Sequence, residues 1–211
     1  SSVYSINSVS DANCSNSAND VITISVNPLP EASLSGGGSL CDDGSTADIV
    51  ITTLGGTPTF NVMYSIGIDN RIVSNVGYQH VISTNEQGIY SLISVTDSKG
   101  CNALNLSGTA NINVNPMPIA SFSAYPQPAN INNPVITFEN TSYNNYSNWI
   151  WNFGDLSNTT IDSTTIGKVL HAYPSDTAGS YIASLQVETD SGCIDIATQI
   201  IVIDDAFKIY I

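Results

Sequence analysis

Apolar and polar residues alternate with a period of two along most of this chain. In one segment Phe60, Val62, Tyr64 and Ile66 fall on the same face, with polar or smaller residues between them. That alternation is typical of half-buried β-strands. Clusters of Gly, Asn and Asp punctuate these short segments, and no segment has the 3.6-residue period of a helix. The sequence therefore predicts an all-β protein built of antiparallel β-sandwiches.

The expected strands fall into two groups. In the middle of the chain they are residues 32–35, 47–53, 60–66, 71–76, 80–83, 90–96 and 109–115. Towards the C-terminus they are residues 120–124, 135–140, 147–153, 168–173, 179–189 and 197–203. Gly36-Gly37-Gly38 lacks the lysine and the following helix of a phosphate-binding loop, so we interpret it as a turn after the first strand.

A short motif that runs from a tyrosine to an acidic residue and then a cysteine occurs three times. The copies are Tyr4–Asp11 with Cys14, Tyr90–Asp97 with Cys101 and, more loosely, Tyr181–Asp190 with Cys193. A period of about 90 residues is typical of serial Ig-like modules. We therefore expect a linear array of tandem Ig-like sandwiches. The first copy lacks the strands that precede its tyrosine, so the chain is expected to start inside a module.

Two proline-rich segments mark the expected module boundaries. Asn27-Pro28-Leu29-Pro30 and Asn115-Pro116-Met117-Pro118 interrupt the alternation, and paired prolines stiffen a linker. We expect them to hold neighbouring modules at a semi-fixed angle. The predicted organisation is the C-terminal strands of a truncated Ig-like repeat (1–28), an Ig-like repeat (29–118), a further module (119–204) and the start of a following segment (205–211).

The charge balance excludes two classes of partner. The chain carries 18 acidic and four basic residues, a net charge of −14, so phosphate backbones and anionic lipids should repel it. It also lacks a run of roughly 20 apolar residues, the length of a membrane helix. We therefore expect no nucleic-acid partner and no direct membrane insertion. The expected partners are neighbouring modules or copies of the same protein, with surface polysaccharide as another candidate.

The four cysteines are spaced unlike a zinc or thioredoxin-type site. Cys41 and Cys101 are the two that share one complete module, so we predict a disulfide between them, stabilising by roughly 4 kcal/mol. Such a bond requires an oxidising compartment. Cys14 is expected to pair within its own incomplete module, and Cys193 has no evident partner. Four reduced, buried thiols are the alternative.

The last module resembles a known family. The segments that carry the resemblance are Val135–Ser142, Trp151–Asp155, His171–Tyr173 and Gly179–Tyr181. In that order they resemble PKD domains, which are Ig-like sandwiches of extracellular proteins. The resemblance covers essentially the whole module. The residues of its core motif are Trp151, Phe153, Gly154, Asp155, His171, Tyr173 and Tyr181. We expect Trp151 and Phe153 to fill the core, and Tyr173 and Tyr181 to pack on adjacent strands.

Three shorter resemblances point to bacterial surface proteins. Asp205–Ile211 resembles the start of the type B, gliding-motility-associated C-terminal sorting domains of Bacteroidetes, and residues 88–101 look like Ig-like repeats from the same bacteria. These resemblances imply export by the type IX secretion system, followed by display at the cell surface or release. Ser163 and Thr177 lie in segments that resemble the O-glycosylation signal of Bacteroidetes.

No arrangement of residues points to catalysis. His80 and His171 are the only histidines, and each fits a structural role better, while no G-x-S-x-G element is present to place a nucleophile. We therefore expect no enzymatic activity and no cofactor. Calcium is an open alternative, because Asp42, Asp43, Asp204 and Asp205 offer carboxylate oxygens, although calcium needs six to eight of them. Tyr143 and Tyr146 are the candidates for contact with a ligand.

The function expected from these features is that of a non-catalytic stalk in an extracellular adhesin or surface fibre. One alternative is a self-assembling filament subunit, in which residues 1–28 complete the sandwich of a neighbour by strand complementation. Another is an accessory, glycan-binding region of a secreted enzyme.

Overall fold

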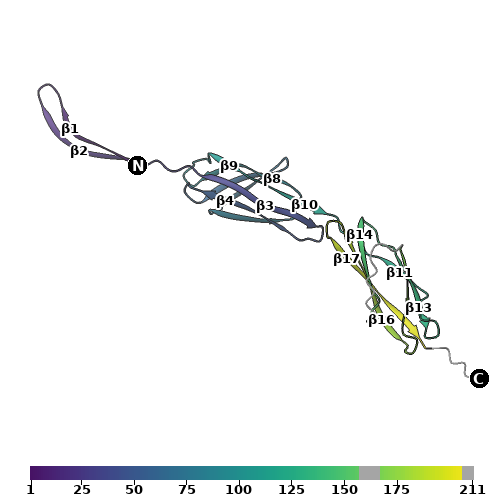
Figure 1. Cartoon of the computed structure of the whole chain (residues 1–211). Helices are drawn as coiled ribbons and strands as arrows, with labels where there is room; N and C mark the ends of the chain where they lie inside the picture. Colours follow the sequence, from purple (N-terminus) through teal and green to yellow (C-terminus); the bar gives the residue numbers. More distant parts are fainter. Residues whose placement is uncertain (157–166, 206–211) are drawn as a thin grey trace, which may run out of the picture. The chain divides into compact units, whose positions relative to one another are not determined.

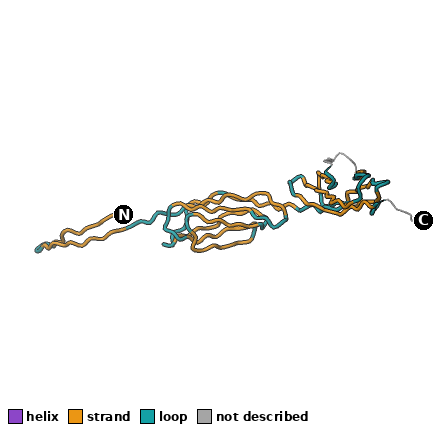
Figure 2. Tube along the Cα trace, turned by 90° about the horizontal axis from the view of Figure 1, so that it is seen from below, coloured by secondary structure: helices purple, strands orange, loops and turns teal. Residues whose placement is uncertain are grey.

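The computed structural model describes residues 1–156 and 167–205. Over these ranges the chain consists of strands and loops (Figures 1 and 2). They include no helix with the length and apolar character of a membrane span. Contacts divide the chain into one unit of Ser1–Gly38 and Thr46–Asn113, and a second of Ser39–Ser45 and Val114–Ile211. The predicted all-β, Ig-like fold class is confirmed.

The first unit holds an Ig-like sandwich with two antiparallel ladders. One ladder has the order β6-β5-β8-β10 and the other β3-β4-β7, and hydrogen bonds between β10 and β3 join them. A short strand, β9, runs parallel to the start of β3. The strands are β3 Glu31–Cys41, β4 Ala47–Leu54, β5 Phe60–Ile66, β6 Asp69–Val76, β7 Gln79–Thr84, β8 Gly88–Asp97, β9 Asn105–Ser107 and β10 Thr109–Asn115.

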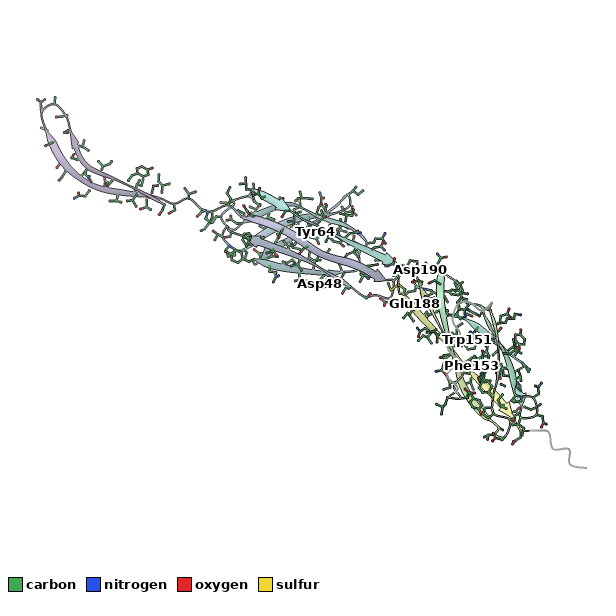
Figure 3. The ribbon with its side chains drawn as sticks, viewed as in Figure 1. Asp48, Tyr64, Trp151, Phe153, Glu188 and Asp190 are labelled. Atoms are coloured by element: carbon green, nitrogen blue, oxygen red, sulfur yellow. A yellow bond between two sulfur atoms is a disulfide. The ribbon has the colours of Figure 1, made fainter. Side chains whose placement is uncertain are left out.

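The core of this sandwich follows the predicted alternation. Phe60, Val62 and Tyr64 of β5 are buried, while the residues between them are exposed or half-buried. Ile49 and Ile51 of β4 are buried in the same way. A strand with one face in the core and one towards solvent has this pattern. Figure 3 shows the side chains of the sandwich, including Tyr64.

The three consecutive glycines belong to β3, so the predicted turn at this point is wrong. β3 pairs with β4 as far as Gly36 and then joins β10 of the other ladder. Gly36 and Gly37 have φ of +99° and +84°, and a Cβ on them would meet the carbonyl oxygens of Asp48 and Asn111 respectively. Only glycine tolerates both the dihedral angle and the close approach. The glycines therefore let one strand cross between ladders without ending.

Tyr90 fixes the start of β8. Its ring is fully buried and stacks on Tyr64, with 6.3 Å between ring centroids. Its hydroxyl donates a 2.8 Å hydrogen bond to the carbonyl oxygen of Glu86, four residues earlier. This is the tyrosine corner of Ig-like sandwiches, in which a core residue also holds the loop that leads into its strand.

Residues before the first linker form a two-stranded hairpin. β1 (Ser2–Ser10) and β2 (Ser15–Ile24) pair antiparallel, with Tyr4 opposite Ile22. Tyr4 occupies the motif position of Tyr90 but is 59% exposed, whereas Tyr90 is 0% exposed. The hairpin thus carries the motif of β8, but within residues 1–156 and 167–205 no further strand pairs with it.

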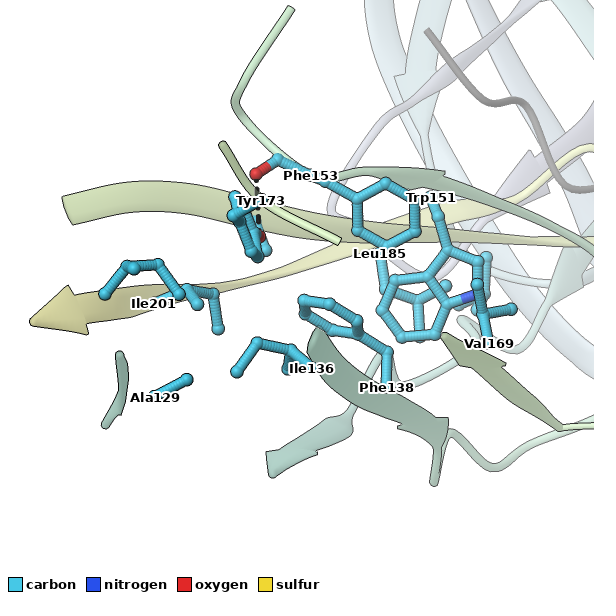
Figure 4. Packing of buried hydrophobic residues seen from close by; sticks show 12 residues of the cluster. Ala129, Ile136, Phe138, Trp151, Phe153, Val169, Tyr173, Leu185 and Ile201 are labelled. Carbon is cyan, nitrogen blue, oxygen red and sulfur yellow. Dashed lines mark hydrogen bonds between the residues drawn. The ribbon is translucent and has the colours of Figure 1, made fainter. Parts of the chain in front are cut away.

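The second unit is a sandwich of two further sheets. Their orders are β11-β13-β15 and β12-β17-β16-β14. Phe138, Trp151 and Leu185 belong to the buried cluster of this unit (Figure 4). The strands are β11 Phe122–Tyr125, β12 Ala129–Asn130, β13 Val135–Asn140, β14 Tyr146–Asn152, β15 Lys168–Ala172, β16 Gly179–Thr189 and β17 Ile194–Asp204.

We predict that Tyr90→Phe destabilises the first unit. The substitution removes the hydrogen bond to Glu86 and leaves the ring in place, which should cost about 1 kcal/mol. Amide hydrogen exchange of residues 88–97 should accelerate accordingly. Tyr4→Phe is the matched control, because an exposed tyrosine should change stability by less than about 0.5 kcal/mol. Equal exchange in the two variants would contradict a structural role for the Tyr90 hydroxyl.

Candidate functional site

The disulfide joins Cys41 to Cys193, with 5.6 Å between their Cα atoms. The predicted Cys41–Cys101 bond is therefore wrong: Cys101 is not disulfide-bonded and is half-buried, and Cys14 is not bonded and is exposed. The prediction assumed that cysteines pair within one sequence module. Instead residues 39–45, which are the last three residues of β3 and the start of the loop that leads to β4, belong to the second unit, and Cys41 is held there beside Cys193. The length of the sequence modules does not indicate that Cys41 belongs to the second unit.

Asn115 of the second linker makes three hydrogen bonds with the same segment and a fourth with the turn before Cys193. Its side-chain amide nitrogen donates to Ser39 Oγ (2.7 Å) and to the carbonyl oxygen of Leu40 (3.0 Å). Its carbonyl oxygen accepts from the amide of Asp42 (2.9 Å). Its side-chain oxygen accepts from Ser191 Oγ (3.2 Å), in the turn before Cys193. Asn115 thus holds together the two segments that carry the bonded cysteines, a role that the sequence analysis missed.

The turn that places Cys193 follows Thr189, at the end of β16. The amide of Thr189 donates to the carbonyl oxygen of Cys193 (2.9 Å), and the amide of Cys193 donates back to Thr189 Oγ1 (3.1 Å). Asp97 and Cys101 make the same two contacts at 3.0 and 2.8 Å. A polar side chain at the strand end therefore closes the turn before the cysteine in both units.

Asp97 is a buried carboxylate that accepts several backbone hydrogen bonds. Burial raises its pKa, but the amides of Cys101, Thr57 and Lys99 all donate to it and together hold the pKa below its ordinary value. The ionised form is therefore the one that the fold stabilises. The carboxylate closes the turn and ties it to the segment that precedes β5.

The aromatic motif residues meet around Phe153, and Trp151 and Phe153 are buried in the core, as predicted. The ring of Trp151 stacks near Phe153 (6.1 Å between centroids), and His171 stacks on the same phenylalanine at 4.0 Å. The Tyr173 hydroxyl donates a 2.9 Å hydrogen bond to the Phe153 carbonyl oxygen (Figure 4). Burial raises the pKa of Tyr173, so it remains a donor. Tyr181 packs against Tyr173 at 4.5 Å.

Asp155 orients His171 from the turn that follows β14. The distance from His171 Nε2 to Asp155 Oδ2 is 2.7 Å, and the two side chains are only 11% and 6% exposed. Gly154 has φ of +79°, and a Cβ there would meet the carbonyl oxygen of Ile182. The histidine is held between a carboxylate and two aromatic rings. This geometry fastens the turn to the core rather than presenting a base to solvent.

The candidate ligand-contact tyrosines have different surroundings. Tyr143 is 56% exposed, and its backbone pairs with Ile119 near the second linker. Tyr146, at the start of β14, is half-buried and packs edge-on against Trp149 at 5.8 Å. Tyr143 therefore remains accessible to a ligand, whereas Tyr146 contributes to packing.

The candidate calcium residues lie exposed at the ends of strands. Asp43 accepts hydrogen bonds from Ser45, which lower its pKa. Asp42, Asp204 and Asp205 are also exposed. In residues 1–156 and 167–205 no three acidic, histidine or cysteine residues cluster as a metal site would require. Calcium binding at either pair stays a prediction.

The remaining candidate residues are placed as follows. Thr177 is exposed, and its hydroxyl donates to Asp176 (3.2 Å). Ser163 lies outside the described residues, as do residues 206–211 of the expected sorting segment. His80 is half-buried in β7, opposite Ile51 of β4. O-glycosylation of Ser163 and Thr177 stays a prediction.

The family of the second sandwich follows from these motif residues and from a direct match. Residues 115–203 match the model of the PKD domain. This part of the chain is a PKD domain. The resemblance predicted from Trp151, Phe153, His171 and Tyr173 is thus confirmed, and the Phe153-centred cluster is the core of the PKD domain. The match covers less than half of the chain and leaves the first unit unassigned.

Solved structures similar to the chain include two PKD domains from Vibrio. The PKD1 domain of the metalloprotease PrtV from Vibrio cholerae has 26% identity and a TM-score of 0.34, covering 42% of this chain and 98% of that one. The PKD1 domain of Epp from Vibrio anguillarum has 21% identity and a TM-score of 0.34, covering 44% and 99%. The N-terminal eight Ig domains of Down syndrome cell adhesion molecule have 14% identity and a TM-score of 0.48, covering 92% and 27%. No protein of curated function matches the chain.

We predict that Cys193→Ser destabilises the PKD domain. The bond spans 152 residues, and on the chain-entropy model its loss costs up to about 5 kcal/mol. Guanidinium unfolding followed by the emission of Trp149 and Trp151, both in this domain, should show a lower midpoint. Cys14→Ser is the control and should leave the midpoint unchanged, because Cys14 is exposed and unbonded. If both variants have the same unfolding midpoint as the parent chain, the bond does not stabilise the domain.

Proposed function

We propose that this chain is a tension-bearing, non-catalytic part of the stalk of an extracellular adhesin or surface fibre. One observation carries the proposal: the Cys41–Cys193 bond makes a short covalent path from the end of β3 to the start of β17. A pull on the two ends of the chain passes through this bond. The 152-residue span between the cysteines lies outside that path, so tension cannot extend it while the bond is intact.

The surroundings of the bond suit this role. Asn115 donates a hydrogen bond to Leu40 and accepts one from Asp42 on one side of the bond, and accepts one from Ser191 on the other. Cys193 is fully buried, which limits the access of reductants and of other thiols. The aromatic cluster around Phe153, with its buried His171–Asp155 pair, serves packing. The surroundings of the bond thus support mechanical continuity.

The disulfide also supports an extracellular location, because such bonds persist in oxidising compartments. The net charge of −14 keeps neighbouring copies soluble through mutual repulsion. Export by the type IX secretion system and display on the surface of a Bacteroidetes cell are the finer form of this proposal. They rest on the sequence resemblances alone.

Pulling single molecules by their ends tests the stalk. The oxidised chain should release only the length outside the loop, and reduction should add roughly 530 Å, the extended length of 152 residues. Cys193→Ser should extend like the reduced chain, and Cys14→Ser like the oxidised one. Equal extension with and without reductant would show that the bond does not carry the load.

The hairpin supports a second candidate, a filament subunit joined by strand complementation. Tyr4, Val9, Ile22 and Ile24 are more than half exposed, whereas their motif equivalents in β8 and β10 are buried. In the first sandwich β8 pairs with β5 along one backbone edge. Within the described residues the equivalent edge of β1 pairs with no strand. A second copy that supplied a strand like β5 would cover the face and pair with this edge.

The mass of the chain in solution tests this second candidate. Light scattering after size exclusion should show assemblies of the full chain and a monomer for the version that starts at Glu31. Ile22→Asp in the full chain is a matched variant, because it keeps the hairpin but places a charge on the apolar face. If all three are monomers, the hairpin does not join subunits.

A further inference from the structure

The last strand of the PKD domain, β17, leaves most of one backbone edge without a partner strand. On one side it pairs with β16 from Ile194 to Ile203. On the other side β12 pairs only with Ile203 and Asp204, and within the described residues no further strand pairs with β17. We call residues 194–201 on this side the open edge of β17.

The direction of the backbone groups along the open edge follows from the ladder with β16. The amide of Thr189 donates to the carbonyl oxygen of Cys193 (2.9 Å), so the backbone of Cys193 faces β16. In an antiparallel ladder alternate residues direct their amides and carbonyls towards the partner strand and away from it. The register of residues 194–203 is regular, so the even-numbered residues face away from β16. The Val202 amide, which donates to Gln127 Oε1 at 3.2 Å, agrees with this direction.

The even-numbered residues also present apolar side chains to solvent. Ile196 and Ile200 are 55% and 62% exposed, and Thr198 between them is exposed as well. Ile201, in contrast, is fully buried in the core (Figure 4). Residues 196–203 include no charged residue, no proline and no glycine. A strand of this composition with an open backbone edge is a template for pairing with another chain.

Other edge strands of the PKD domain carry features that oppose such pairing. β15 begins with the exposed Lys168, and β14 has an irregular register between Tyr146 and Asn148. β11 is four residues long and is followed directly by Pro126. Lysines, bulges, prolines and short strands are the usual protection of sheet edges. The open edge of β17 has a regular register and contains neither a lysine nor a proline.

The sequence of the open edge is complementary to itself. Two copies that pair antiparallel around Thr198 place this threonine opposite its own counterpart, and Ile196 opposite Ile200 of the second copy. Pairs of β-branched residues and of threonines are favourable neighbours across strands. A second copy therefore supplies both the main-chain groups and the side chains that the edge can pair with, in a closed two-fold arrangement.

The charges are compatible with this register. The chain has a net charge of −14, so two copies approach most easily where acidic residues are few. Asp195 is the one charged residue in the sequence of the open edge. It would lie opposite Ile201 of the second copy, roughly 20 Å along the strand from the Asp195 of that copy. This separation exceeds the screening length of about 8 Å at physiological salt, so the two carboxylates repel each other weakly.

We propose that the open edge of β17 is a surface for self-association. Two copies of the chain pair antiparallel around Thr198, and their four-stranded sheets join into one continuous sheet. The contact uses residues 195–201 of each copy, fewer than the roughly 20–30 residues a side of a standard interface. It therefore forms at high local concentration, as between stalks anchored side by side, and separates in dilute solution. The inference goes beyond the proposed stalk and does not depend on the load carried by the disulfide, which extension under force tests separately.

Sedimentation equilibrium over a range of concentrations tests the association. Every chain carries Ile22→Asp, so that the apolar face of the hairpin does not contribute. Towards about 1 mM this parent should pass from monomer to dimer, as weakly binding proteins do. Ile200→Lys should remain a monomer, because a lysine on an edge strand opposes pairing. Ile182→Lys is the matched control and should dimerise like the parent, since Ile182 is 65% exposed and lies opposite Ile200 on β16, one strand away from the open edge.

Three results would overturn the proposal. A parent that stays monomeric throughout shows no self-association. Loss of the dimer in both lysine variants would indicate contact through the face of the sheet, and its survival in both would indicate contact elsewhere. Emission of Trp149 and Trp151, compared with that of the parent, shows in each case that the PKD domain has folded.

A single introduced cysteine tests the register. In a background of Ile22→Asp, Cys14→Ser and Cys101→Ser, Thr198→Cys places two thiols opposite each other, with Cα atoms about 5.5 Å apart, a distance that a disulfide spans. Oxidised glutathione at about 1 mM protein should then give a covalent dimer.

Ser184→Cys in the same background is the control for the register. Ser184 lies opposite Thr198 on β16, away from the open edge, and should give no covalent dimer. Equal cross-linking of the two variants, or a dimer in solution whose Thr198→Cys form does not cross-link, would show that the copies do not pair around Thr198.

Discussion

The bond between Cys41 and Cys193 sets the covalent topology on which the other features depend. It closes a loop that contains most of the first sandwich and most of the PKD domain, although each has a core of its own. Residues 39–45, which include the last three residues of β3, belong to the second unit even though the rest of β3 and all of β4 belong to the first. The hydrogen bonds of Asn115 and the turn after Thr189 both position the residues that meet at this bond.

The strand–turn motif shows how far local sequence determines local structure. Asp11, Asp97 and Thr189 each close a turn before a cysteine with the same contacts, although one turn lies in an isolated hairpin and the others in complete sandwiches. The local sequence does not determine the burial of these strands in the same way. Tyr4 and Tyr90 begin matching strands, but only Tyr90 is covered, because burial needs strands from elsewhere in the module. The turn is thus a local property, and the core is a property of the whole sandwich.

The elements that sequence predicted well are those governed by local periodicity. Strands such as Phe60–Ile66 and Val135–Asn140 have the expected bounds, because alternation over several residues reflects one buried face. The short strands β9 and β12 were missed, since two or three residues cannot show a period. Gly36–Gly38 looked like a turn, because glycines that let a strand cross between ladders resemble glycines that end it.

The candidate site was predictable only in part. The aromatic residues around Phe153 carry a family pattern, whereas the partner of Cys41 depends on which unit holds the end of β3. That packing is decided by contacts more than 70 residues apart in sequence, such as those of Asn115 with Ser39 and Ser191. No local sequence pattern indicates these long-range contacts.

The closed loop has a further consequence for a protein exposed to proteases. Of the four basic residues, Arg71, Lys99 and Lys168 lie between Cys41 and Cys193. A protease that cuts after lysine or arginine at any of these three leaves two pieces that the disulfide still joins. A single cleavage between residues 41 and 193 therefore leaves the N-terminal and C-terminal parts of the chain covalently joined. Only a cleavage outside residues 41–193 releases a part of the chain.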